Sequence, residues 1–116
     1  MIIDFASRKT TLVATPVDGR NGLSTLTFMA ESLLGIPVAE GNDYVVFVSR
    51  NRKVCKIVFW DEHGACMVVR RLNSGRFAKF LMRASGPAAA PITPEELMAY
   101  LDGENLQVER QGMLKN

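Results

Sequence analysis

The sequence is poor in the residues from which most catalytic and metal sites are built. It has one histidine, His63, and two cysteines, Cys55 and Cys66, which are too few ligands for a zinc site. No serine or cysteine has an evident base partner, and no glycine-rich phosphate loop is present. Asp18 and Asp61 lie in turn-rich segments, where isolated acids usually accept backbone hydrogen bonds. We therefore predict a binding protein without catalysis, cofactor or metal.

Long hydrophobic runs are also absent. No apolar run approaches the roughly 18 residues that a membrane span needs. The N-terminal residues include the acidic Asp4 and lack a basic cluster followed by an apolar core, so they do not look like a secretory signal. We expect a cytoplasmic protein with no membrane partner.

The composition is ordinary for a small globular protein. Of the 116 residues, 47% are hydrophobic and 22% are charged, which is typical of a domain with a modest core. We expect a single domain over 1–116, with its core at about 11–106 and loose termini at 1–9 and 107–116.

Three runs rich in β-branched and aromatic residues occupy the middle of the chain: Tyr44–Ser49, Val54–Trp60 and Ala65–Leu72. The two breaks between them are short and polar. The break Asp61–Gly64 begins with Asp and ends with Gly, the preference of a type I turn, and the break before Val54 contains an asparagine, which tolerates positive φ. This spacing indicates an antiparallel meander.

Two-residue loops in both breaks would fix the pairing of the strands. Val46 would then lie opposite Ile57, and Ile57 opposite Val68. Cys55 and Cys66 would sit on neighbouring strands with an offset of four residues, at about 3.3 Å each, which is too far for a disulfide. We predict two free, core-packed thiols.

In this register both faces of the meander are largely apolar, whereas a solvated face should alternate with polar residues. One face carries Tyr44, Val46, Val48, Cys55, Ile57, Phe59, Cys66 and Val68, with Arg70 at its end. The other carries Val45, Phe47, Val54, Val58, Trp60, Met67 and Val69, with Lys56 and Arg71 among them. A bulge at Gly64 would reverse the facing of the third strand. A helix of the chain can cover one face, and the second needs the chain's termini or another molecule, which is a first indication of a partner.

An N-terminal helix is expected before the meander. Apolar residues recur at helical spacing and predict a helix at about 22–34. Gly35 and Pro37 should end it, as a C′ glycine followed by proline commonly does. The apolar positions are Leu23, Leu26, Ala30, Leu33 and Leu34.

A short C-terminal helix is expected at about 94–102. Thr93 can cap it, Pro94 suits its first position, and Glu96 can complete a capping box. Together these elements predict an α+β fold: an antiparallel three- to four-stranded meander at roughly 44–82, packed by the two helices.

The remaining segments are less regular. Thr11–Ala14 is a candidate short strand, and residues 76–83 form either a fourth short strand or an irregular arm. The small, alanine- and proline-rich segment Ser85–Pro91 is typical of a mobile loop.

Charge is distributed unevenly along the chain. The segment from Tyr44 to Arg83 holds nine basic and two acidic residues, while the rest of the chain holds five basic and ten acidic residues. A basic region of this kind attracts polyanions and commonly contacts phosphates. The alternative is that these cations only solvate loops and protect sheet edges.

The cations of the meander divide into two kinds. Those at the first hairpin tip can reach phosphates without losing their hydration. Those within strands can extend the patch, and Lys56 with Arg71 could form a concave cationic site on one face. Adjacent Arg70 and Arg71 must point to opposite faces, so one of them should make a structural pair. The predicted nucleic-acid-binding residues are Arg50, Arg52, Lys53, Lys56, Arg71 and Arg76.

A resemblance to a known family lies in residues along most of the chain, from about Thr11 to Leu106. It rests on Asp18-Gly19-Arg20-Asn21-Gly22-Leu23 with Leu26, on Phe47, Arg50, Arg52, Lys56-Ile57, Trp60-Asp61, Gly64, Arg71-Leu72 and Gly75-Arg76-Phe77, and on Ile92-Thr93-Pro94-Glu95-Glu96-Leu97 with Leu101-Asp102-Gly103. In these residues the chain resembles the TnpB or Orf-two-like accessory proteins of insertion-sequence family sixty-six. It departs from their pattern in having Lys53-Val54, Asn73 and Lys79-Phe80 where an Asp-Arg, a Glu and a Trp-Pro are usual.

The resemblance implies a protein encoded beside a separate transposase that assists transposition, and it carries over no catalytic residues. We expect a non-enzymatic accessory protein that binds element-end DNA, or a transposase–DNA complex, through the basic hairpin surface. The alternative is a protein–protein adaptor or homodimer that docks the transposase through an apolar sheet face. An enzyme would need a cluster of acids around Asp18 and Asp61.

Overall fold

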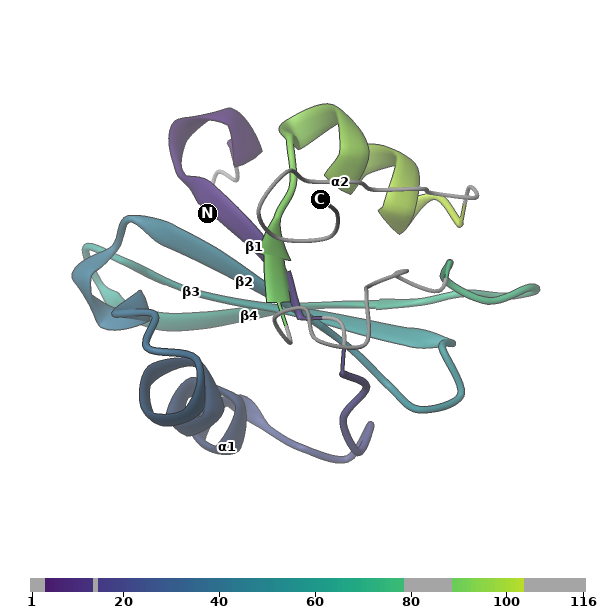
Figure 1. Ribbon diagram of the computed structural model, residues 1–116, viewed down its shortest axis with the longest axis horizontal. Coiled ribbons are helices and arrows are strands. Elements are labelled where there is room, and N and C mark those ends of the chain that lie inside the picture. The colour runs from purple at the N-terminus through teal and green to yellow at the C-terminus, as the bar shows by residue number, and fades with distance from the viewer. Residues whose placement is uncertain (1–3, 14, 79–88, 104–116) are drawn as a thin grey trace, which may run out of the picture.

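The computed structural model describes residues 4–13, 15–78 and 89–103, which form a five-stranded sheet with helices on both sides (Figure 1). The strands lie in the order β4-β3-β2-β1-β5. Their bounds are Lys9–Val13 (β1), Asp43–Val48 (β2), Val54–Asp61 (β3), Gly64–Arg71 (β4) and Ala89–Pro91 (β5). The helices are Leu23–Phe28 (α1) and Pro94–Leu101 (α2), with a π-helical turn at Met29–Leu33 and 3-10 turns at Phe5–Ser7 and Val38–Glu40.

The predicted meander is confirmed in its strands and in its register. β2, β3 and β4 pair antiparallel, with Val46 opposite Ile57 and Ile57 opposite Val68. Cys55 and Cys66 are both free thiols, as expected from their offset. Burial raises the pKa of the Cys55 thiol to about 12. No bulge intervenes at Gly64, which pairs directly with Asp61.

The candidate short strand at Thr11–Ala14 is largely confirmed by β1, Lys9–Val13, but its parallel pairing in this sheet was not predicted. β1 pairs parallel with β2, with Thr10 opposite Tyr44, and the connection between them runs through α1. Such a parallel pair needs a long crossover, which the helix provides. Phe5 packs edge-on against Tyr44 with ring centroids 5.1 Å apart. Phe5 and Lys9 thus belong to the packed fold, within the range 1–9 for which a loose terminus was expected.

The far edge of the sheet corrects the prediction of a mobile loop over Ser85–Pro91. Residues 89–91 form β5, antiparallel to β1, and the Ile92 amide donates to the Thr10 carbonyl at 3.0 Å. A proline is acceptable in this strand because an edge strand pairs on one side only. Residues 79–88 lie outside the described part, as does most of the expected fourth strand or arm at 76–83.

The N-terminal helix begins at Leu23 as predicted, but one of its expected core positions is wrong. Leu26 and Ala30 are fully buried, whereas Leu33 is 68% exposed. The Leu34 amide donates to the Met29 carbonyl, a wider turn that shifts the apolar face by one residue and brings Leu34 inward. Gly35 follows with φ +68°, as expected of a C′ glycine.

Both faces of the sheet are covered by the chain itself (Figure 1). Leu26 and Ala30 pack on the face that carries Val45, Phe47 and Val58. The opposite face is covered by α2 and by Phe77, together with Leu72 and Ala78 after β4; its buried residues are Leu12, Tyr44, Val46, Val48, Cys55, Ile57, Phe59, Phe77, Ile92, Leu97, Tyr100 and Leu101. The second apolar face therefore gives no indication of a partner.

The C-terminal helix α2 is confirmed with its predicted cap. The Thr93 hydroxyl accepts from the Glu96 amide at 3.1 Å, and the Glu96 carboxylate accepts from the Thr93 amide at 2.8 Å. Tyr100 stacks on Phe77 with centroids 5.2 Å apart, which joins the helix to the segment after β4. The expected loose terminus at 107–116 lies outside the described residues.

Substitutions at two neighbouring residues of α2 test whether this helix covers the second face of the sheet. Leu97 is fully buried and Met98 is half exposed. Leu97→Ala should lower the free energy of unfolding by about 2–5 kcal/mol, because it removes packed core volume. Met98→Ala should change it by no more than about 0.5 kcal/mol. Chemical denaturation of the two variants measures both values, and equal effects would contradict the placement of α2.

Candidate nucleic-acid interface

The directions of the strands bring the predicted cations to one end of the sheet. β2 ends and β3 begins at the first hairpin, which carries Arg50, Arg52 and Lys53. β4 ends beside them, since Arg71 pairs with Val54. The second hairpin, with its acidic Asp61 and Glu62, lies at the opposite end.

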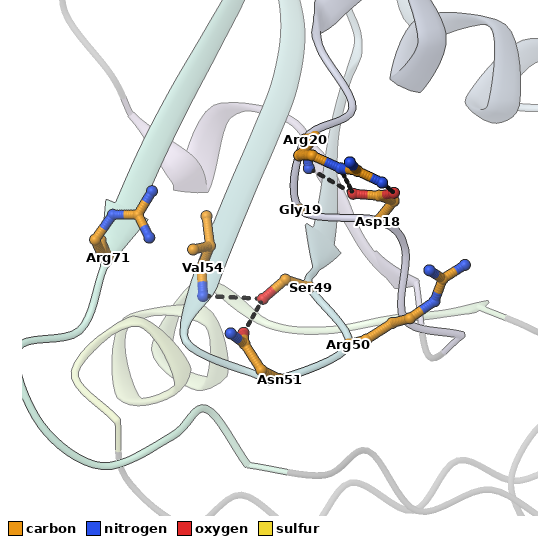
Figure 2. A pocket seen from close by; sticks show the side chains of 8 residues that line it. All are labelled: Asp18, Gly19, Arg20, Ser49, Arg50, Asn51, Val54 and Arg71. Atoms are coloured by element: carbon orange, nitrogen blue, oxygen red, sulfur yellow. Dashed lines mark hydrogen bonds and ion pairs between the residues drawn. The ribbon is translucent and has the colours of Figure 1, made fainter.

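A chain of hydrogen bonds fixes the first hairpin (Figure 2). The Val54 amide donates to Ser49 Oγ at 3.1 Å, and Ser49 Oγ donates to Asn51 Oδ1 at 2.7 Å. The Lys53 amide donates to the same Asn51 oxygen at 3.0 Å. Arg52, and not Asn51, is the residue of this turn with a positive φ, +58°.

The segment after β4, which contains Arg76 and Phe77, is hydrogen-bonded to this hairpin. The Phe77 amide donates to the Arg52 carbonyl at 2.6 Å, and Arg52 Nη1 donates to the Phe77 carbonyl at 3.1 Å. Arg76 Nε donates to the Asn51 carbonyl at 3.0 Å. Arg52 and Arg76 therefore each use one N–H group to hold the backbone, and their positions relative to the tip are fixed.

A third segment, the loop after β1, closes the same end of the sheet. The Val17 amide donates to the Val48 carbonyl at 2.9 Å, and the Arg50 amide donates to the Val17 carbonyl at 3.1 Å. Asp18 then forms an ion pair with Arg20, with Oδ2 2.7 Å from Nη2. The loop is thereby joined to the hairpin tip as a short extension of the sheet.

Lys56 corrects one part of the predicted site. It was expected to form a concave cationic site with Arg71, but its ammonium group donates to the carbonyls of Gly19 at 2.8 Å and Asn21 at 2.7 Å. A half-buried ammonium held by two backbone oxygens stabilises the loop after β1. Lys56 is a structural clamp for this end of the sheet.

The loop after β1, the first hairpin and the end of β4 line an open groove of about 450 Å³ (Figure 2). In this view Arg71 and Arg50 lie on either side of Ser49, Asn51 and Val54, with the Asp18–Arg20 pair above them. Among the described residues, the guanidinium groups of Arg50 and Arg71 make no hydrogen bond or ion pair, and neither does the Lys53 ammonium. The groove lining is Asp18, Gly19, Arg20, Ser49, Arg50, Asn51, Val54 and Arg71.

The one carboxylate in the groove, Asp18, is ion-paired with Arg20. Asp18 accepts from the Arg20 side chain through both oxygens and from the Arg20 amide at 2.9 Å. These bonds hold the pKa of Asp18 well below its usual range, and the side-chain bond raises the pKa of Arg20. Asp18 is therefore ionised at neutral pH, and Arg50 and Arg71 leave the groove with a net positive charge.

The six predicted residues thus share one end of the sheet but differ in how they are held. No hydrogen bond or ion pair is described for the side chains of Arg50, Lys53 and Arg71, although the charge of Arg50 contributes a little to lowering the pKa of Asp18. Arg52, Lys56 and Arg76 support the backbone. Arg70 points to the other face and donates to the Leu101 carbonyl at 3.1 Å, which confirms that one arginine of the adjacent pair is structural.

The sequence did not identify Asp18, Arg20 or Asn51 as residues of the site, although all three line the groove. The first two had been interpreted as part of a turn, and their nearness to the hairpin depends on the parallel contact between Val17 and Ser49. The signal that could have found them is the Asp18–Leu23 motif of the family resemblance, which lies far from the basic segment in sequence.

Among the residues that the structure describes, the acids do not form a cluster around Asp18 and Asp61. Asp61 Oδ1 accepts from the amides of His63 at 2.8 Å and Gly64 at 3.1 Å, and the first of these bonds contributes most to lowering the pKa of Asp61. Asp18 and Asp61 lie at opposite ends of the sheet, and each carboxylate accepts hydrogen bonds from backbone amides of its own turn. Within the ranges 4–13, 15–78 and 89–103, no three His, Cys, Asp or Glu side chains come together as metal ligands.

No helix in the described part of the chain has both the length and the apolar character of a membrane span.

Comparisons with known proteins agree with the family resemblance. A family model described as "IS66 Orf2 like protein" matches residues 8–111. The uncharacterized protein y4hO of Sinorhizobium fredii is 33% identical over 86 residues, which cover 74% of this chain and 71% of that protein. No solved structure matches the chain.

The clamp role of Lys56 predicts a loss of stability when its ammonium is removed. Lys56→Met should lower the free energy of unfolding by about 1–3 kcal/mol, because two carbonyls lose a charged donor. The matched variant Lys53→Met, at an exposed position of the same hairpin, should change it by about 0.5 kcal/mol or less. Urea denaturation measures the free energy of unfolding of both variants, and equal values would contradict the structural role of Lys56.

The Asp18–Arg20 pair predicts a dependence of stability on pH. Since the folded pKa of Asp18 lies below its unfolded value of about 3.9, its contribution is complete above that value and declines as the pH falls toward the folded pKa. The melting-temperature difference between the wild type and Asp18→Asn should therefore be constant from pH 7 to 5 and shrink below pH 4.

Glu62→Gln, in the other hairpin, reports the general effect of removing one negative charge. A difference between wild type and Asp18→Asn that does not change between pH 5 and pH 2 would contradict the ion pair.

Proposed function

Since the chain belongs to the IS66 Orf2-like family, a family of accessory proteins of insertion-sequence transposition, we propose that it binds DNA through the end of the sheet that carries the first hairpin. The surface consists of the tip Arg50–Lys53 with Arg71, Arg76 and Arg20 beside it. The DNA is that of the element ends, either alone or already bound by the co-encoded transposase. No catalytic step is assigned to the protein.

The observation that supports this proposal most strongly is that Arg50, Lys53 and Arg71 are held at one end of the sheet without described partners. A cation in an ion pair would have to give up its partner before it could bind a phosphate, whereas these three need not. The bonds of Arg52 and Arg76 hold the backbone of the tip, so little backbone entropy is lost on binding. Cations gathered at one surface without ion-pair partners are typical of proteins that recognise the phosphate backbone.

The adaptor alternative has lost its original support, because α2 and Phe77 cover the second apolar face. An affinity experiment distinguishes the adaptor from a protein that binds DNA. If the protein retains the co-encoded transposase on an affinity resin after nuclease digestion, protein contacts contribute; if retention needs intact DNA, the cationic surface carries the association.

The salt dependence of DNA binding tests the proposal. Each phosphate contact contributes about −0.9 to the slope of log K against log salt concentration. Replacing Arg50, Lys53 and Arg71 together by alanine should therefore reduce the magnitude of that slope by up to about three and weaken binding at low salt. A fluorescence-anisotropy titration with an element-end duplex at several salt concentrations measures both quantities.

Lys9→Ala is the matched control, because Lys9 is exposed at the opposite end of β1. It should leave the slope unchanged. Absence of binding at low salt, or equal slopes for the wild type and the triple variant, would overturn the proposal.

A further inference from the structure

One edge of the sheet is a long strand without a second neighbour in the described part of the chain. β4 is eight residues long and stands at one end of the strand order β4-β3-β2-β1-β5. Every residue of β2, in the middle of the sheet, is buried, whereas none of β4 is. The other edge, β5, has three residues and contains Pro91, a common protection against pairing with a further strand. The two edges therefore differ in their capacity to accept another strand.

The backbone groups on the open side of β4 belong to alternate residues. The Leu72 amide donates to the Lys53 carbonyl at 3.0 Å, so the even-numbered residues of β4 are the ones bonded to β3. The odd-numbered residues direct their N–H and C=O groups away from the sheet, and within the ranges 4–13, 15–78 and 89–103 these groups make no hydrogen bond. They are Ala65, Met67, Val69 and Arg71.

The features that usually protect such an edge are missing from the centre of β4. Ala65–Val69 contains no charged residue and no proline, and its pairing with β3 is continuous, without a bulge. Val69 is 48% exposed although it is apolar. An open edge with these properties can be extended by a further strand, which adds main-chain hydrogen bonds and covers the exposed side chain.

The charges at the two ends of β4 match those of a second copy of the same strand. Asp61 and Glu62 precede the strand, and Arg70 and Arg71 end it. When two β4 strands pair antiparallel, the arginines of each copy come to the acidic hairpin of the other, whereas parallel pairing would place arginines beside arginines. The antiparallel pair is also two-fold symmetric, so the same surface serves in both copies.

We propose that two copies of the chain associate through antiparallel pairing of their β4 strands, which joins the two sheets into one. The proposal goes beyond DNA binding and uses the edge of the sheet, a surface distinct from both covered apolar faces. The register that employs every outward backbone group is centred on Val68, which then lies opposite Val68 of the second copy. Met67 of each copy covers Val69 of the other, and the small Ala65 lies opposite Arg71. This pairing engages the main chain of Arg71, not its guanidinium group.

Sedimentation velocity over a dilution series tests the association. The wild type should reach about twice the chain mass of 12.8 kDa. Val69→Pro should weaken the dissociation constant about ten-fold or more, because proline removes an outward N–H and leaves the bonds between β3 and β4 intact. The matched variant Val69→Thr keeps this N–H and should still dimerise, and amide NMR dispersion shows whether each variant is folded. A wild type that stays monomeric up to about 1 mM would overturn the proposal.

Cross-linking tests the register. In a Cys66→Ser background, Val68→Cys places two thiols at a non-hydrogen-bonded pair, with Cα atoms about 4.5 Å apart, which suits a disulfide. Ala65→Cys in the same background is the control, because its two thiols would lie about 20 Å apart along the strands. Mild oxidation should give a covalent dimer with Val68→Cys alone. Cross-linking of Ala65→Cys with none at Val68→Cys would overturn the register.

Hydrogen exchange of the wild type tests the same edge without a substitution. The outward amides of Met67 and Val69 should be protected in the dimer and should exchange faster on dilution, while the amide of Val68, bonded to β3, stays protected. Protection of Met67 and Val69 in a protein of monomer mass would show that the chain covers its own edge. A dimer in which they are unprotected would place the contact elsewhere, and either result overturns the proposal.

Discussion

The pairing of β3 along both of its edges is the constraint on which the rest of the structure depends. Because β3 is bonded to β2 on one side and to β4 on the other, the facing of every side chain in the meander is fixed. Two apolar faces result, and α1 and α2 cover one each. The same pairing places the first hairpin and the end of β4 side by side, so that Val54 lies opposite Arg71 and the cations meet at one end.

The parts of this arrangement that could be predicted from the sequence are those set by local chemistry. The two short breaks between the β-branched runs, with their turn residues, were sufficient for the register of the meander, and Thr93 with Glu96 for the start of α2. The parallel pairing of β1 could not be predicted, because it depends on a crossover of some thirty residues and on a strand, Lys9–Val13, with little apolar pattern of its own. β5 was missed for a similar reason: its alanines and proline are typical of loops, and only the open edge of β1 makes them a strand.

The candidate site also contains residues that could be predicted from the sequence and residues that could not. The sequence indicated that Arg50, Lys53 and Arg71 would share a region, because hairpin geometry alone brings them together. It could not distinguish them from Lys56, whose ammonium is bound by carbonyls 35 and 37 residues away in the chain. Nor could it place Asp18 and Arg20 beside the hairpin tip. The cations that hold the backbone and those left for a ligand differ in partners that only tertiary structure supplies.

In the proposed function one end of the sheet, and not the molecule's surface in general, binds DNA. Mapping an element-end duplex onto the protein by amide chemical shifts tests this most directly. We expect the perturbations to concentrate at Gly19, at the tip Arg50–Lys53 and at Arg71, while the second hairpin at Glu62 and His63 is unaffected. Perturbations centred on the second hairpin or on α2, with the first hairpin unchanged, would contradict it.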